Sequence, residues 1–263
     1  MTTLVLKLML TPALIGIASL AGRRWGPAVS GWLVGLPFTS GPIAFFLALN
    51  SGLPFATSAA AGILTGTLSQ AAFALAYAAL AHRHRWPLPF VAGCVAFGAA
   101  TVALQFVHLP IGWRFVLALA ALTLTLSLLP TGTKADGNIQ VAPPWWDLPA
   151  RMGVATALVV LLTAAAPALG AYLTGLLAPF PIYASILTIF AHRERGYGAA
   201  INVLRGLQLG LLAFASFFLV IGTLLEPLGL APAFLLAIGI ALLVQSGSLW
   251  LLRRGEQRPA IPS

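Results

Sequence analysis

Long apolar stretches dominate the chain and are separated by short segments that carry most of its charge. Residues 25–82 contain 58 positions without Lys, Arg, Asp or Glu, which is enough for two membrane passes at about 20 residues each. Such runs predict transmembrane helices. We therefore expect an all-α integral membrane protein. The apolar runs and their breaks predict nine spans: 2–22, 27–49, 54–81, 87–107, 110–130, 150–167, 168–190, 198–224 and 229–252.

Composition agrees with this pattern. The 263 residues are 60% hydrophobic and 7% charged, with a mean hydropathy of +0.98, whereas an average soluble domain is about 25% charged. The formal net charge is +9, but the cations lie in short loops, where they normally set membrane orientation. The charge therefore does not indicate a nucleic-acid partner.

The basic residues alternate from one side to the other. The loops after the first, third, fifth, seventh and ninth spans carry Arg23 and Arg24, Arg83 and Arg85, Lys134, Arg193 and Arg195, and Arg253 and Arg254. The other loops carry almost none. Because basic loops stay in the cytoplasm, we expect the N-terminus outside and the C-terminus in the cytoplasm.

Two halves of the chain resemble each other. Pro27, Gly35 and Leu36 match Pro167, Gly175 and Leu176 at a separation of 140, and the stretches near Lys7 and Phe90 match those near Arg151 and Phe234 at 144. We expect a four-helix repeat in 1–108, a linker helix and loop in 109–149, a second repeat in 150–254 and a tail in 255–263. The extra span inverts the second copy. Inverted repeats are common in secondary transporters.

The second repeat resembles the GlpM family of small bacterial inner-membrane proteins. The matching residues are Gly175-Leu176, Pro179-Phe180-Pro181 and Glu194-Arg195-Gly196, with Lys7 and Arg151 at the start of the two repeats. The resemblance implies four-span units that pair antiparallel in the bacterial inner membrane. It implies no molecular activity.

The second and seventh spans are broken by proline. Pro37 and Pro42 interrupt one, and Pro179 and Pro181 interrupt the other. Each break falls near the bilayer midplane, where freed backbone groups are costly unless protein, water or ligand satisfies them. Thr39 and Ser40 follow the first break, and Tyr183 and Ser185 follow the second. We expect these hydroxyls and the half-helix N-termini to form a substrate site.

Intramembrane charge favours an anionic substrate. All five acidic residues, Asp136, Asp147, Glu194, Glu226 and Glu256, fall in loops or at span ends. Cations enter the spans instead: Lys7 and Arg151 in the first turns of equivalent spans, and Arg205 deeper, with Asn202 and Gln208 on the same face. Either snorkelling to the interface or a role in a pathway explains Lys7 and Arg151.

The sequence gives no support for a metal site, a nucleotide site or a catalytic nucleophile. The histidines lack metal-ligand spacing, and no Walker loop or catalytic serine or cysteine arrangement occurs. We expect no enzyme and no cofactor.

The sequence predicts a secondary transporter or flippase-like carrier of a small organic anion or an anionic lipid headgroup, working by alternating access. Its partners would be membrane lipid and a small anionic or phosphate-bearing substrate, and a homodimer is compatible with the sequence. Two alternatives stay open: a passive anion channel, and a non-transporting assembly factor for envelope polysaccharide synthesis.

Overall fold

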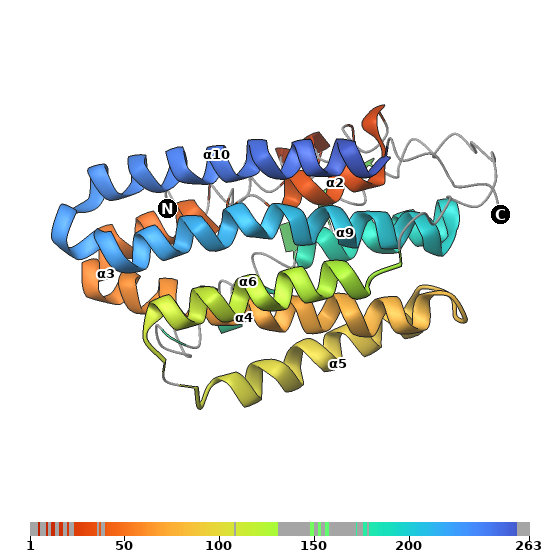
Figure 1. The fold of residues 1–263 in the computed structure, drawn as a ribbon, viewed down its shortest axis with the longest axis horizontal. Coiled ribbons are helices and arrows are strands. Elements are labelled where there is room, and N and C mark those ends of the chain that lie inside the picture. Colours follow the sequence, from red (N-terminus) through yellow and green to blue (C-terminus); the bar gives the residue numbers. More distant parts are fainter. Residues whose placement is uncertain are drawn as a thin grey trace.

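A computed structural model gives the fold of the chain (Figure 1). It describes residues 24–35, 37, 40–107, 109–130 and 179–256, together with isolated positions in 5–20 and 148–177. Within these residues the regular structure is entirely helical, with no strand. The helices are α2 (Pro27–Val34), α3 (Ser40–Ser51), α4 (Leu53–Ala81), α5 (Pro87–Leu104), α6 (Ile111–Leu128), α9 (Ile182–Leu228) and α10 (Leu230–Glu256).

Five of these helices are long and apolar enough to cross a membrane: α4, α5, α6, α9 and α10. Their bounds follow the predicted spans closely, because apolar length is a local property of the sequence. The predicted all-α membrane class is therefore confirmed at this level. Most of the first and sixth predicted spans, most of residues 168–178 in the seventh, and the loop at 131–147 lie outside the described residues.

The helix α9 consists of two arms that meet at Gly196. This glycine has φ 79° and ψ 179°, a conformation that side chains disfavour. The short arm, 182–195, runs out to one end of the molecule, and the long arm, 197–228, runs back along it (Figure 1). Leu187 of the short arm and Val203 of the long arm share a hydrophobic cluster, so the arms pack against each other.

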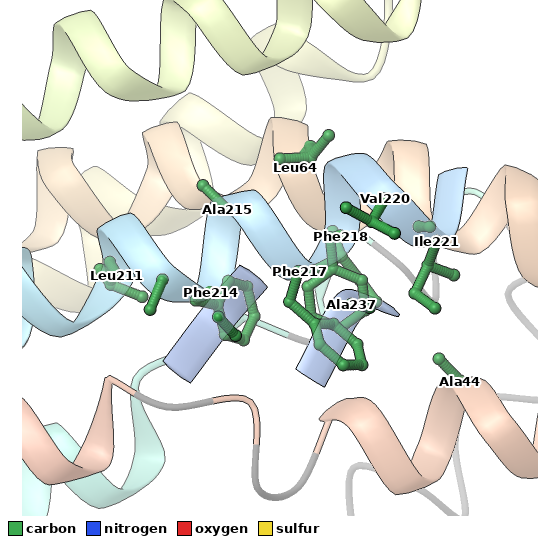
Figure 2. Close-up of a cluster of buried hydrophobic side chains, with 14 of the residues drawn as sticks. Ala44, Leu64, Leu211, Phe214, Ala215, Phe217, Phe218, Val220, Ile221 and Ala237 are labelled. Carbon is green, nitrogen blue, oxygen red and sulfur yellow. The ribbon is translucent and has the colours of Figure 1, made fainter. Parts of the chain in front are cut away.

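The long arm of α9 is the centre of the bundle. The helix contacts α2, α4, α6 and α10, and α6 packs against both α4 and α9 (Figure 1). The main core gathers side chains of α3, α4, α9 and α10, and Figure 2 shows its aromatic centre with Phe214, Phe217 and Phe218. A single packed unit therefore surrounds the two proline-rich segments.

Candidate functional site

The first break separates α2 from α3. The helix α2 ends at Val34 and α3 begins at Ser40, with Pro37 between them and Ser40 buried. Protein groups satisfy part of the interrupted backbone. The Gly41 N–H donates to the Pro37 carbonyl at 2.8 Å, and the Gln245 side-chain amide donates to the Trp32 carbonyl at 3.2 Å. The break is thus a defined part of the packed structure.

The helix α2 approaches the long arm of α9 backbone to backbone. Gly31 and Gly35 face Gly206 and Gly210, and a Cβ on Gly35 would lie 2.5 Å from the Gly210 Cα. A Cβ on Gly206 would collide with the Ala28 carbonyl. Small residues spaced by four allow such close crossings in membranes. This glycine pairing was not predicted, although both helices carry the pattern G-x-x-x-G in the sequence.

Aromatic side chains fill the space beside the first break. A Cβ on Gly41 would lie 3.5 Å from the Phe217 ring, and the Phe217 ring packs edge-on against Phe234 with centroids 5.9 Å apart. Figure 2 places Phe217 and Phe218 among α9, α10 and α3, with Ala44 on α3. The surroundings of this break are apolar.

The second break precedes the short arm of α9. Pro179 and Pro181 are non-helical, and the Pro181 carbonyl accepts the first helical hydrogen bond, from the Ser185 N–H at 2.6 Å. Pro179 packs on α4: a Cβ on Gly66 would lie 2.8 Å from the Pro179 Cγ. The Phe180 ring packs edge-on against Phe97 of α5 with centroids 5.1 Å apart. The chain is therefore broken at both predicted places.

A polar seam follows the second break, between α4 and the short arm of α9. Two contacts bracket it: Gly66 with Pro179 at one end, and the Tyr77 hydroxyl 3.0 Å from the His192 Nδ1 at the other. Gln70 lies between Gly66 and Tyr77 on one face of α4, because residues four, seven and eleven positions apart lie on one side of a helix.

On the facing arm, Ser185 and Thr188 lie on the same side as His192 for the same reason. The polar seam is therefore formed by Gln70, Ser185 and Thr188. Each has a buried side-chain oxygen without a hydrogen-bond partner among the described residues. A buried polar group left unpaired costs about 1–3 kcal/mol. Three of them in one seam indicate a place that a polar ligand or water would occupy.

The polar face predicted on the long arm of α9 is directed toward the end of α6 and does not join the polar seam. Arg205 donates to the Leu126 and Leu129 carbonyls at 3.0 and 2.7 Å, at the C-terminal end of α6. Free carbonyls at a helix C-terminus favour such a cation. Asn202 and Gln208 share this face, and Gln208 is fully buried with neither amide atom bonded to a described residue. Arg205 thus has a structural explanation beside the predicted one.

A buried arginine was missed by the sequence interpretation. Arg114, near the start of α6, is 8% exposed. Its guanidinium donates to the Leu109 carbonyl at 2.6 Å, the Thr65 hydroxyl at 2.9 Å and the Tyr172 hydroxyl at 3.0 Å. All these acceptors are neutral, and the Tyr172 ring lies beneath the cation at 5.2 Å. The sequence feature that could have identified it is a lone Arg within an apolar run.

The remaining predicted residues have different positions. Lys7, Thr39 and Arg151 lie outside the described residues. Pro42 lies in the first turn of α3, so the prediction that it interrupts the span is wrong: the first N–H groups of a helix have no partner inside it, and a proline there removes no helical hydrogen bond. Tyr183 lies half-buried at the start of the short arm. In the described part of the chain, no group of three or more His, Cys, Asp or Glu could hold a metal ion. Ser185 is therefore the one predicted site residue in the polar seam, where it lies with Thr188 of the same arm and Gln70 of α4.

No protein-family model, curated protein or solved structure matches this chain.

Proposed function

We propose that this protein is a secondary carrier of a small organic anion or an anionic lipid headgroup, with its substrate site in the polar seam beside the second helix break. The observation that carries the proposal is a set of buried polar atoms beside that break that have no hydrogen-bond partner among the described residues. The Ser185 and Thr188 hydroxyls follow the break and can donate to an anion, and the Gln70 Oε1 on the facing helix α4 can accept from a substrate hydroxyl. Broken helices with polar groups near the midplane are where many transporters bind substrate.

Internal duplication supports the transporter architecture. The glycine pair Gly206 and Gly210 that receives α2 lies 144 positions after Gly62 and Gly66, and Gly66 contacts Pro179 of the second broken segment. Each broken span thus packs against a G-x-x-x-G face in the other half of the chain. The turn glycines Gly52 and Gly196 have the same separation and similar φ values of 88° and 79°.

Side-chain pairs repeat in the same way. The Phe73 and Phe90 rings lie 6.4 Å apart at 71°, and the rings of Phe217 and Phe234, 144 positions later, lie 5.9 Å apart at 75°. The helices α4 and α5 run opposite to the long arm of α9 and α10 (Figure 1). These relations favour two inverted repeats joined by α6. The GlpM-like origin of each repeat is part of the same proposal.

Hydrogen bonds between the halves also correspond. The Trp32 indole donates to the Ser248 hydroxyl at 2.9 Å, and the Tyr172 hydroxyl lies 3.4 Å from the Leu104 carbonyl. Tyr172 is 140 positions after Trp32, and Ser248 is 144 after Leu104. The first half of each broken span is therefore fastened to the last helix of the opposite repeat.

The two seams differ in polarity. In the other repeat, the positions that correspond to Ser185, Thr188 and Gln70 are Gly41, Ala44 and Phe214, 144 positions earlier or later. One seam thus holds unpaired oxygens, and the other holds an aromatic cluster (Figure 2). A symmetrical pore would be lined by similar groups in both halves. This difference in composition therefore favours a carrier over a symmetrical pore.

A ligand screen followed by flux tests the proposal. Purified protein is tested by thermal unfolding against succinate, inorganic phosphate and undecaprenyl phosphate, and the stabilising anion is then followed into proteoliposomes. We expect saturable uptake that falls at least tenfold in Gln70→Leu with Ser185→Ala, which removes substrate hydrogen bonds. Unsaturable uptake would instead favour the channel alternative.

The assembly-factor alternative has an observation in its favour, since protein groups pack both breaks and Gln245 satisfies the Trp32 carbonyl. A Pro37→Ala and Pro181→Ala variant separates the two hypotheses. Unchanged stability with no anion effect on either protein would favour the assembly factor. Loss of ligand stabilisation in the folded variant would favour the carrier.

A further inference from the structure

A cationic cavity lies between the loop that joins α4 to α5 and the turn where the two arms of α9 meet. Both segments lie at the same end of the molecule (Figure 1). Its volume is about 540 Å³, which falls within the range of small-molecule sites. The lining contains three arginines, three histidines and two aromatic residues: Arg83, Arg85, Arg193, His82, His84, His192, Trp86 and Tyr197. Among the described residues, no carboxylate lines it.

We propose that this cavity binds the phosphate group of an anionic ligand, either on a lipid headgroup or as free phosphate. Arginine guanidinium groups match phosphate oxygens with paired N–H donors, which gives both charge and geometry. If these two basic segments did not meet, their charges would be spread over the surface. Here the fold brings residues more than 100 positions apart into one concave site.

The inner wall of the cavity is held by a buried tyrosine. Tyr77 is fully buried, and its hydroxyl lies 3.0 Å from the His192 Nδ1. When the hydroxyl donates to Nδ1, the proton of a neutral imidazole resides on Nε2, which then acts as a donor. An anion in the cavity favours this tautomer. Tyr77 is thus a positioning residue for His192.

The backbone around the cavity also fixes its shape. Gly196 lines it and has a φ of 79°, so the sharp turn between the arms of α9 depends on glycine. This turn places Arg193 and Tyr197 opposite the loop that carries Arg83 and Arg85. The site is therefore built by two elements, and neither element alone could form it.

This proposal rests on the lining of the cavity and does not require transport. The test measures equilibrium binding in detergent, with thermal-shift titration of inorganic phosphate and native mass spectrometry of dioleoyl phosphatidic acid against dioleoyl phosphatidylcholine. The test variant is Arg83→Gln with Arg193→Gln. The matched control is Arg195→Gln, an exposed arginine of the same arm that does not line the cavity.

We expect the double variant to bind at least about tenfold more weakly and Arg195→Gln to change less than about twofold, because charge-assisted hydrogen bonds at a built site are lost only in the first. Stabilisation by phosphate and phosphatidic acid together would indicate recognition of the phosphate group itself. Retention of phosphatidic acid alone would assign the site to a lipid headgroup. Equal losses in both variants, or no binding of either probe, would overturn the proposal. All three arginines are exposed, so the variants should fold.

Discussion

Gly35 at the end of α2 and Gly210 in the long arm of α9 lie so close that a Cβ on Gly35 would be 2.5 Å from the Gly210 Cα. No side chain separates the two backbones there. Because helices in lipid associate through close packing, this contact holds the C-terminal end of α2 against α9, next to the first break.

Substituting Gly210 by Ala should destabilise the protein by about 1–3 kcal/mol, because the new methyl group would meet the Trp32 carbonyl and the Gly35 Cα. The thermal unfolding midpoint in mild detergent measures the effect. Gly239→Ala on α10 is the control, since nothing lies within 4 Å of its Cβ position and Ala favours a helix. Equal midpoints for the two variants would contradict the close crossing.

The hydrogen bond between the Trp32 indole and the Ser248 hydroxyl should couple α2 to α10. A double-mutant cycle with Trp32→Phe and Ser248→Ala should give a coupling free energy of about 0.6 kcal/mol, which is usual for such bonds in membranes. Trp25→Phe serves as the control, because Trp25 is 65% exposed. Strict additivity of the Trp32 and Ser248 variants would show that the bond contributes nothing.

Arg114→Gln should destabilise the protein by about 2–4 kcal/mol, since it removes a buried cation that donates to Leu109, Thr65 and Tyr172 and takes one hydrogen bond from each. Arg114→Lys should recover only part of this loss, because an ammonium group cannot reproduce the planar fork. Chemical unfolding in detergent compares the two. A loss no larger than that of the exposed Arg195→Gln would rule out a structural role for Arg114.

Much of the helical structure could be predicted from the sequence because its causes are local. Apolar length set the bounds of α4, α5 and α6, and proline chemistry placed the interruptions before Ser40 and Ile182. The separation of the seventh and eighth spans was also expected, and it falls at Gly196, where a positive φ makes glycine necessary.

The candidate site was less accessible because it depends on which helix faces meet. Gln70 and Thr188 are not singled out by the sequence, because only the packing of α4 on the short arm of α9 places them on facing sides. Arg205 looked like a pathway residue until the end of α6 supplied its carbonyl partners. Ser185 was the one member of the polar seam that its position after a proline break made predictable.

Ser185→Ala and Ser216→Ala form a matched pair for the central claim. Both serines are buried in α9, but Ser216 donates to the Leu212 carbonyl of its own helix at 2.9 Å, whereas the Ser185 hydroxyl has no described partner. Removing an unpaired buried oxygen should leave stability unchanged or raise it by up to about 1 kcal/mol. Ser216→Ala should leave ligand binding intact.

The most direct measurement is the anion-induced shift of the unfolding midpoint in wild type, Ser185→Ala and Ser216→Ala. If the polar seam binds the substrate, wild type and Ser216→Ala will share the shift, and Ser185→Ala will lose most of it while remaining as stable as wild type without ligand. A full shift in Ser185→Ala, or no shift in wild type with any of the three anions, would contradict a substrate site in the seam.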